Sequence, residues 1–194
     1  MGLVPNLAVV AAHPRLLNLI GSLCVGGVAA AMALGLPALD RALPAERRPP
    51  ADRPYLVGAG VRLLPPEGAL LDLTATRPGP RAGAVRFQLG AVRIVVVAGP
   101  FSGDLAAAER RLRRKITARR GVQVTGPQAP TSTDAGVPGL SGGYASPGRI
   151  GRFQVFLHRG IAVEITVSGA ESDLGAVIDR VDASARSLAF RTGR

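Results

Sequence analysis

The sequence of 194 residues contains no tryptophan, a single cysteine and few aromatic residues of any kind. The cysteine, Cys24, lies inside a long uncharged run, so the rest of the chain can form no disulfide and no thiolate metal site. With aromatic residues at 4%, the core must be built mainly from valine, leucine, isoleucine and alanine. This composition leaves the redox compartment open, because a domain without cysteine folds on either side of a membrane.

Lysine is nearly absent as well, although the chain is strongly basic. Lys115 is the only lysine among 24 basic residues, and 13 acidic residues leave a formal net charge of +11. Net charge bears on partners and solubility rather than on fold. Two explanations stay open: an arginine-rich coding bias, which would also enrich alanine, glycine and proline, and a selected anionic partner.

Charge is also missing from an apolar run that extends from Leu16 to Leu39. At about 1.5 Å per residue, a helix over 16–39 would be about 36 Å long, enough for a hydrocarbon core of about 30 Å. We therefore expect one transmembrane helix, preceded by a flank at 1–15. Its expected membrane-anchoring side chains are Leu16, Leu19, Ile20, Val25, Val28, Met32 and Leu36.

Three other interpretations fit this run less well. A cleaved signal peptide needs a more basic start, a shorter apolar core and a small-residue cleavage site. A lipoprotein needs a small residue before its cysteine, and Leu23 stands there. A buried helix in a soluble protein rarely reaches this length without a charged residue.

The charges that flank the run make its orientation ambiguous. Arginines follow it at positions 41, 47, 48 and 53, whereas only Arg15 precedes it. The positive-inside rule then places the following domain in the cytoplasm. Long domains, however, translocate largely regardless of charge. The charge count alone leaves the side of the membrane undecided.

A linker and a domain follow the run. Residues 40–56 are rich in proline and charge, which predicts an extended spacer. Residues 57–190 form the expected domain, with a tail at 191–194. We expect strands at 61–64, 69–74, 85–89, 92–98, 122–125, 140–145, 152–158 and 161–168. We also expect a helix that Ser102 or Asp104 caps and that runs to about 120, and a last helix at about 171–188. Adjacent strands with two helices indicate an α+β domain in which the helices pack on an antiparallel sheet.

Hydrophobic periodicity also predicts the contacts between the helices and the sheet. In the strand at 161–168 the odd positions are apolar, while Glu164 and Thr166 lie on the other face. The residues expected to be buried where the helices pack on the sheet are Val95, Val97, Leu112, Ile165, Ile178 and Val181.

This order of elements resembles a known family. The chain is similar to actinobacterial single-pass envelope proteins with a Mog1/PsbP-like domain. The similarity lies in the order of its parts: the apolar run, the proline-rich spacer, the helix after Ala98-Gly99-Pro100-Phe101, the glycine-rich middle, the hairpin and the last helix. Further cues are the strand ending at Leu63-Leu64-Pro65 and the strand at 163–169. The resemblance implies a non-catalytic accessory module that faces outward from the inner membrane, and it transfers no functional residue.

No catalytic, cofactor or metal site is expected. Gly139-Leu140-Ser141-Gly142-Gly143 matches the G-x-S-x-G pattern of hydrolases, but Pro147 and Gly148 prevent the helix that should follow such a nucleophile. His158 is the only later histidine and has no cysteine to share a zinc ion. Gly58-Ala59-Gly60 lacks the third glycine of a dinucleotide fingerprint.

The densest chemical feature is a cationic segment in the first predicted helix of the domain. With Leu112 and Ile116 turned to the core, most of its basic residues would occupy the outer face. One explanation is a solvated helix face, and the other is a contact with anionic lipid, an acidic polymer or an acidic protein. Nucleic acid is disfavoured, because no aromatic residue lies in the segment to stack on bases. The candidate residues for an anionic partner are Arg110, Arg111, Arg113, Arg114, Lys115, Arg119 and Arg120.

We therefore expect a membrane-tethered, non-enzymatic accessory or interaction module of the cell envelope, which needs no cofactor and belongs to a larger membrane assembly. Its expected partners are the lipid bilayer, through 16–39, and another membrane or envelope protein. Its expected location is the inner membrane, with the domain outside the cytoplasm. The alternative is a membrane-anchored basic domain that binds polyanions on the cytoplasmic side.

Overall fold

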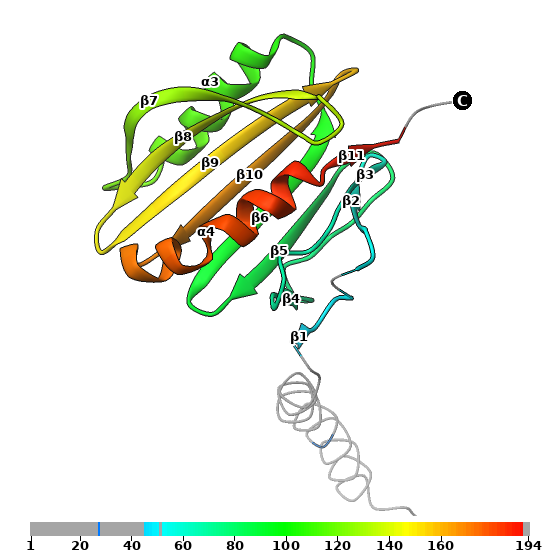
Figure 1. Cartoon of the computed structure of the whole chain (residues 1–194), viewed down its shortest axis with the longest axis horizontal. Helices are drawn as coiled ribbons and strands as arrows, with labels where there is room; N and C mark the ends of the chain where they lie inside the picture. Colours follow the sequence, from blue (N-terminus) through cyan, green and yellow to red (C-terminus); the bar gives the residue numbers. More distant parts are fainter. Residues whose placement is uncertain (1–26, 28–44, 51, 192–194) are drawn as a thin grey trace, which may run out of the picture. The chain divides into compact units, whose positions relative to one another are not determined.

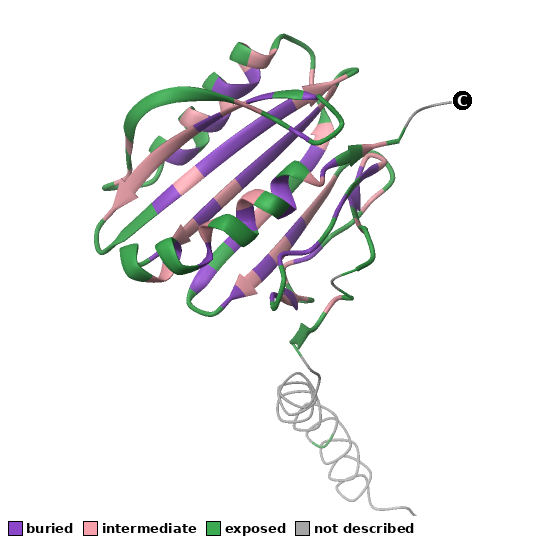
Figure 2. Ribbon diagram, viewed as in Figure 1, coloured by how far each residue is buried: buried purple, intermediate pink, exposed green. Residues whose placement is uncertain are grey.

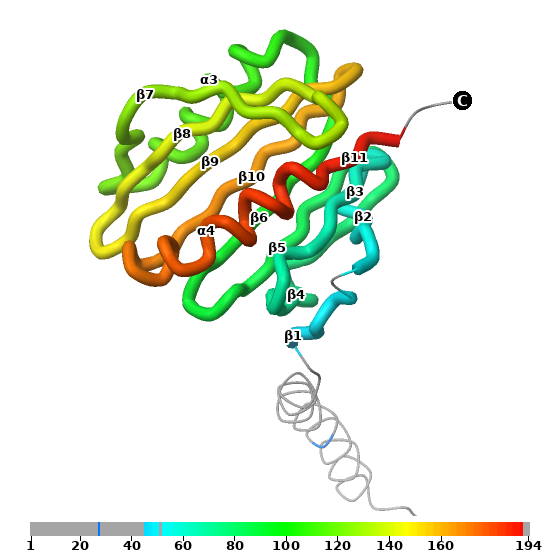
Figure 3. Tube along the Cα trace, viewed as in Figure 1, coloured from blue at the N-terminus to red at the C-terminus, as the bar shows by residue number. Residues whose placement is uncertain are grey.

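Eight antiparallel strands form the main sheet of the domain, in the spatial order β1-β4-β5-β6-β10-β9-β8-β7 (Figure 1). In chain order the strands are β1 (Glu46–Arg47), β4 (Leu70–Asp72), β5 (Gly83–Leu89), β6 (Val92–Pro100), β7 (Gln123–Ser132), β8 (Pro138–Ser146), β9 (Arg149–His158) and β10 (Ile161–Gly169). A small second sheet contains β2 (Tyr55–Gly58), β3 (Val61–Leu63) and β11 (Ala189–Phe190). Figure 3 shows β11 beside β3, so the last strand of the chain pairs with a strand from the early part of the domain.

The computed structural model describes residues 27, 45–50 and 52–191. The domain boundary falls after Pro44, and residues 45–194 make up one unit. Of the expected transmembrane helix only Gly27 is described, so that prediction lies outside the described residues. Within the described part of the chain, no helix has the length and apolarity needed to cross a membrane.

Helix α4 (Glu171–Arg186) covers one face of the main sheet, where it contacts β6, β9 and β10 (Figure 1). Leu174, Val177 and Val181 form its buried stripe at helical spacing, as the sequence predicts. They pack on alternate residues of the strands, including the fully buried Phe87 and Phe156. This is the larger of the two hydrophobic cores, and Figure 2 shows its buried positions beneath α4.

Helix α3 (Leu105–Thr117) covers the opposite face, over β7, β8 and β9. The carboxylate of Asp104 accepts a hydrogen bond of 2.6 Å from the backbone N–H of Ala107 and so caps the first turn. Leu112 and Ile116 pack on Phe153 and Val155 of β9 in a second, smaller core. The two helices therefore lie on opposite faces of one sheet.

The predicted fold class is confirmed for the domain: the structure is α+β, with an antiparallel sheet and two packed helices. The predicted hairpin is present as well. Arg159 and Gly160 join β9 to β10 with φ values of 47° and 75°. Positive φ at both central residues is the geometry of a tight two-residue hairpin turn.

Two segments depart from the predicted element boundaries. Residues 46–47, expected within the linker, form β1, which pairs with β4, and β2 at 55–58 begins two residues before the expected start of the domain. Strand β7 was expected only over 122–125, but it extends to Ser132 and pairs with β8 across a register shift between Thr125 and Ala129. Gly126 and Pro127 predict a loop from the local sequence, but cross-strand hydrogen bonds hold this segment in the sheet.

The expected burial of Val97 is wrong, and that of Val95 and Ile178 is only partial. Val97 is 36% exposed, whereas its neighbours Val96 and Ala98 are buried in the α4 core. The odd residues of β6 point to the α3 face, and α3 lies over β7 to β9 rather than over β6. Leu112, Ile165 and Val181 are buried as predicted.

Candidate functional site

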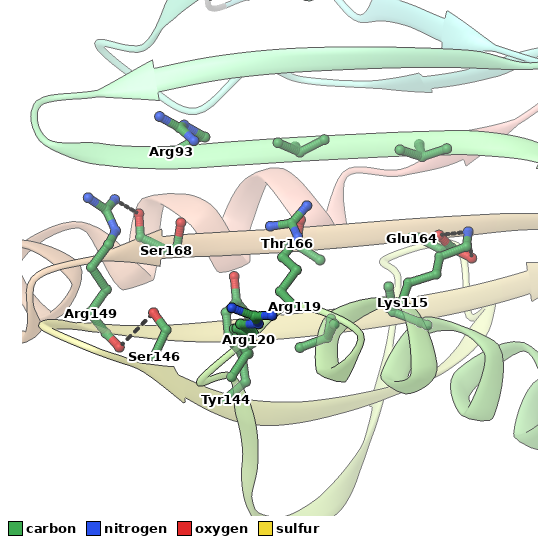
Figure 4. A pocket seen from close by; sticks show the side chains of 15 residues that line it. Arg93, Lys115, Arg119, Arg120, Tyr144, Ser146, Arg149, Glu164, Thr166 and Ser168 are labelled. Carbon is green, nitrogen blue, oxygen red and sulfur yellow. Dashed lines mark hydrogen bonds and ion pairs between the residues drawn. The ribbon is translucent and has the colours of Figure 1, made fainter.

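A basic cleft lies on the α3 face, beside the C-terminal end of that helix (Figure 4). Its volume is about 460 Å³, within the range of about 300–1,000 Å³ that is usual for small-molecule sites. The cleft is lined by Arg93, Val95, Val97, Leu112, Lys115, Ile116, Arg119, Arg120, Val122, Tyr144, Ser146, Arg149, Glu164, Thr166 and Ser168.

The floor of the basic cleft is built from three cross-strand pairs of β6 and β10. Arg93 lies opposite Ser168, Val95 opposite Thr166, and Val97 opposite Glu164. Side chains of directly opposed residues lie on the same face of a sheet, so all six belong to the α3 face. The residues that alternate with these six face α4, so each strand contributes side chains both to the larger core and to the cleft.

The walls come from segments that are distant in sequence. The end of α3 contributes Leu112, Lys115 and Ile116, and the turn that follows contributes Arg119 and Arg120. The end of β8 contributes Tyr144 and Ser146, and the start of β9 contributes Arg149. Figure 4 shows Arg149 near Ser168 at one end of the cleft and Lys115 near Glu164 at the other.

Glu164 is the only acidic residue in the lining, and its charge is already matched. Its side chain is buried, with one carboxylate oxygen 2.7 Å from Lys115 Nζ and the other 2.9 Å from Arg111 Nη2. The Arg111 guanidinium also lies over the Phe101 ring, 4.4 Å from its centroid. A buried carboxylate with two cations satisfies the rule that buried charges are paired, so Glu164 neutralises no other cation of the cleft.

The remaining four cations of the cleft have no acidic partner among the described residues. No described carboxylate lies within 4.0 Å of Arg93, Arg119, Arg120 or Arg149. Arg149 Nη2 donates a hydrogen bond of 2.9 Å to the backbone oxygen of Ser168, which holds that side chain at the cleft. Guanidinium groups present several donors in a fixed plane and suit carboxylate or phosphate oxygens. The basic cleft therefore has the chemistry of an anion-binding site.

Tyr144 lies between these arginines and is held in place from two sides. Its hydroxyl donates a hydrogen bond of 2.9 Å to the backbone oxygen of Val167. Its ring crosses β9 above Gly151, where any Cβ would overlap the ring. Burial raises the pKa of Tyr144 above its usual value, against the opposing effects of Ser168 and the nearby arginines. The hydroxyl is therefore protonated at neutral pH.

The structure divides the predicted cationic face into three groups. Arg111 and Lys115 turn inward to Glu164, and Arg113 Nε lies 3.6 Å from the buried Glu109. Arg110 and Arg114 are exposed and lie outside the cleft lining. Only Arg119 and Arg120, beyond the end of α3, line the cleft as unpaired cations. Of the seven predicted cations, Glu164 thus holds Arg111 and Lys115 at the sheet, and the others do not share one site.

Sequence reasoning missed Arg93, Tyr144 and Arg149 as site residues. The alternation of Arg93, Val95 and Val97 with buried neighbours was a signal that these three share a face. Nothing local in the sequence indicates that residues 93, 144 and 149 converge, because their proximity depends on strand order.

The G-x-S-x-G string is the middle of strand β8 and does not form a nucleophile elbow. Ser141 Oγ donates a hydrogen bond of 3.1 Å to the backbone oxygen of Ala129 in β7. Gly139 and Gly142 lie opposite Phe156 and Phe153 of β9, and a Cβ at either glycine would come within 2.5 Å of the ring. The glycines thus make room for aromatic side chains of the neighbouring strand.

The other candidate motifs are also structural. Gly58-Ala59-Gly60 forms the connection from β2 to β3, where Ala59 and Gly60 have φ values of 52° and 77°. The His158 ring lies against Phe190, with 5.2 Å between the ring centroids. Over residues 45–50 and 52–191, no group of three or more histidine, cysteine, aspartate or glutamate residues could hold a metal ion.

No family model and no curated protein sequence matches this chain. Among solved structures, cyanobacterial PsbP (CyanoP) from Synechocystis sp. PCC 6803 is similar at 16% identity, with 72% of this chain and 92% of that chain covered and a TM-score of 0.51. PA94 from Pseudomonas aeruginosa, a protein of unknown function, matches at 14% identity, with 69% and 99% covered and a TM-score of 0.46. LpqN from Mycobacterium tuberculosis, described as involved in cell envelope biogenesis, matches at 13% identity, with 76% and 83% covered and a TM-score of 0.40. The domain of this chain has a PsbP-like fold.

Proposed function

We propose that this protein is a membrane-tethered, non-catalytic accessory module of the cell envelope whose basic cleft holds an anionic group of a partner molecule. One observation carries the binding role: four arginines around one cleft have no acidic partner among the described residues. Like charges brought together repel one another, so such an arrangement is costly unless an anion binds between them.

The lining of the basic cleft supports binding rather than catalysis. General acid–base catalysis needs a positioned group that exchanges a proton with the substrate, and nucleophilic catalysis needs an activated nucleophile. The lining contains no histidine or cysteine, and its one carboxylate, Glu164, is held by Arg111 and Lys115. The hydroxyl of Tyr144 is engaged with Val167, and the raised pKa of Tyr144 disfavours its ionised form. What remains is a set of hydrogen-bond donors arranged around a cavity.

The tether and the location are supported by the sequence. The uncharged run at 16–39 has the length of a membrane span, and the element order resembles actinobacterial single-pass envelope proteins. We therefore propose an inner-membrane protein whose domain lies outside the cytoplasm and contacts another envelope protein or an anionic lipid. Full-length protein should stay with membranes through carbonate washing. Val28→Arg should weaken this retention, because a central arginine costs about 2.5–3.5 kcal/mol of insertion free energy.

A second candidate function has a specific observation in its favour. The arginines at 41, 47, 48 and 53 place the domain in the cytoplasm by the positive-inside rule, where it would bind polyanions. A reporter fused after Arg194 separates the two candidates, because alkaline phosphatase is active only outside the cytoplasm and green fluorescent protein folds inside it. Phosphatase activity supports the envelope role, and fluorescence alone supports the cytoplasmic one.

Anion binding can be tested through the tyrosines. The chain has two tyrosines and no tryptophan, so Tyr55→Phe leaves Tyr144 as its only strong fluorophore. Inorganic phosphate should change the emission of this variant saturably, and more weakly at 1 M salt, where the Debye length is about 3 Å. Adding Arg119→Gln and Arg120→Gln should raise the dissociation constant about tenfold or more, since each lost contact is a charge-assisted hydrogen bond.

The matched control changes two cations of α3 that lie outside the cleft. Arg110→Gln with Arg114→Gln removes the same net charge, and both side chains are exposed. This control should bind phosphate nearly as the parent does. Equal losses in the two double variants would show a general charge effect and would contradict a cleft-specific site.

A further inference from the structure

The floor of the basic cleft carries free arginines at one end and valine side chains, beside the paired Glu164, toward the other. Resting on the proposed anion-binding function, we propose that its ligand is an anionic amphiphile, with a phosphate group at the arginine end and an alkyl chain over Val95 and Val97. The floor itself is graded: along β6 the cleft side carries Arg93, then Val95, then Val97. Each step of two residues spans about 7 Å, so the charged and apolar ends are about 14 Å apart along the strand.

The arginine end is defined by contacts as well as by sequence. Arg93 lies opposite Ser168, and the Arg149 guanidinium donates to the backbone oxygen of the same Ser168. The hydroxyls of Ser146 and Ser168 belong to the same lining. Several guanidinium groups and hydroxyls around one point match a phosphate, which has three strong acceptor oxygens, better than they match a carboxylate, which has two.

The other end has the properties of a seat for an alkyl chain. Val97 is 36% exposed although it lies in a central strand, and Val95 is partly exposed beside it. Leu112 and Ile116 of α3 form the neighbouring wall. Apolar side chains left open to water in a central strand gain free energy when another apolar group covers them.

Charge does not oppose an alkyl chain at that end. Glu164, opposite Val97, is buried and paired with Lys115 and Arg111 through hydrogen bonds of 2.7–3.1 Å. A chain over Val95 and Val97 would therefore not have to strip water from an unpaired carboxylate, which would be costly. The ion pair of Glu164 lies beside Val97, at the end of the cleft away from Arg93 and Arg149.

The test uses the full-length chain with Tyr55→Phe in phosphatidylcholine nanodiscs, followed by Tyr144 fluorescence. Titrants are inorganic phosphate and the methyl, propyl and hexyl phosphates, each below its micellar concentration, with hexanol as the uncharged control. Each buried methylene should raise affinity by about two- to fourfold, so hexyl phosphate should bind at least about tenfold more tightly than inorganic phosphate. Hexanol should not bind at the same concentrations.

Two sets of variants assign the two ends. Val95→Thr with Val97→Thr keeps the side-chain shape and the β-branching, and it should remove the gain with chain length while leaving inorganic phosphate binding unchanged. Val97→Thr alone provides a milder version if the double variant melts early. Arg119→Gln with Arg120→Gln should weaken all the phosphates, and Arg110→Gln with Arg114→Gln should weaken none of them.

The outcomes separate this inference from the function it rests on. If inorganic phosphate does not bind, or the Arg119–Arg120 variant binds as the parent does, the anion site and the amphiphile both fail. If phosphate binds but hexyl phosphate is no tighter, or the gain survives in the threonine variants, only the amphiphile is overturned. Vesicles that contain phosphatidic acid then identify the source of the phosphate: displacement of hexyl phosphate indicates a lipid headgroup, and no displacement indicates a soluble phosphate ester.

Discussion

The two faces of the main sheet differ in how far they are closed, although the same strands build both. On the α4 face, Val92, Ile94 and Val96 of β6 are buried in a continuous hydrophobic core. On the α3 face, Arg93 and Val97 of the same strand line an open cleft. The helix on this side lies over β7 to β9 and leaves part of the sheet uncovered.

Within strand β6, the residues on one face should therefore serve stability and the residues on the other face should serve binding. The α4 face holds most of the large buried apolar side chains, so it should supply most of the free energy of folding. The α3 face holds buried carboxylates with their cations, and paired charges add little net stability compared with apolar packing. Substitutions on the two faces should therefore have different consequences, and four measurements test this contrast.

The largest effect is expected in the α4 core. Phe87→Ala should lower the free energy of unfolding by about 3–5 kcal/mol, because its side chain is fully buried and the space would be filled only in part. Urea unfolding of a chain that starts at Ala45 measures this loss. A loss below about 1 kcal/mol would mean that this face is not the main source of stability.

Neighbouring residues of β6 offer a direct comparison of the faces. Val96→Ala should cost about 2 kcal/mol, from two lost methylenes and a small cavity, while Val97→Ala should cost below about 0.5 kcal/mol. The chemical change and the strand are the same, so only the face differs. Equal losses in urea unfolding would remove the distinction between a closed and an open face.

Breaking the ion pair of Glu164 on the α3 face should lower the stability of the domain by an intermediate to small amount. The same change should strengthen the binding of phosphate. Glu164→Gln removes the charge that Arg111 and Lys115 share. We expect a loss of about 1–2 kcal/mol, below the value for a fully buried pair because both cations reach solvent. Phosphate should bind this variant more tightly, since the released Lys115 would add a cation to the basic cleft.

Glu67→Gln is the control for this substitution, because Glu67 is exposed. This control should change the free energy of unfolding by less than about 0.5 kcal/mol. It should leave the affinity for phosphate unchanged. Weaker phosphate binding by Glu164→Gln would contradict the assignment of Glu164 as a structural residue that keeps Lys115 occupied.

The smallest effect concerns the ionisation of Tyr144. In the Tyr55→Phe variant, absorbance at 295 nm should show one tyrosine whose midpoint lies above its usual value of about 10, because burial disfavours the phenolate. The folded chain then holds this proton more tightly than the unfolded chain does. Its contribution to stability is complete below pH 10 and is lost as the pH rises through the folded-state pKa. A midpoint below 10 would show that the arginines outweigh burial.

Local patterns predicted the regular elements better than their ends. The stripe of Leu174, Val177 and Val181 specifies which side of α4 is buried, and the alternation in 161–168 specifies β10, because both patterns follow from the geometry of one element. The prediction for strand β7 is too short because Gly126 and Pro127 interrupt its local pattern, while its pairing with β8 depends on residues up to Ala145.

The sequence by itself determined the α+β class, the two amphipathic helices, the hairpin at Arg159-Gly160 and the apolar run at 16–39. These features follow from periodicity and turn chemistry over a few neighbouring residues. Only the tertiary structure decided which side of β6 would stay open and which cations would be free. Arg111 meets Glu164 across 53 positions and Lys115 meets it across 49, so their pairing depends on where α3 packs on the sheet. Strand order brings Arg93 of β6 and Arg149 of β9 to one cleft, and the packing of α3 adds Arg119; no local pattern encodes either.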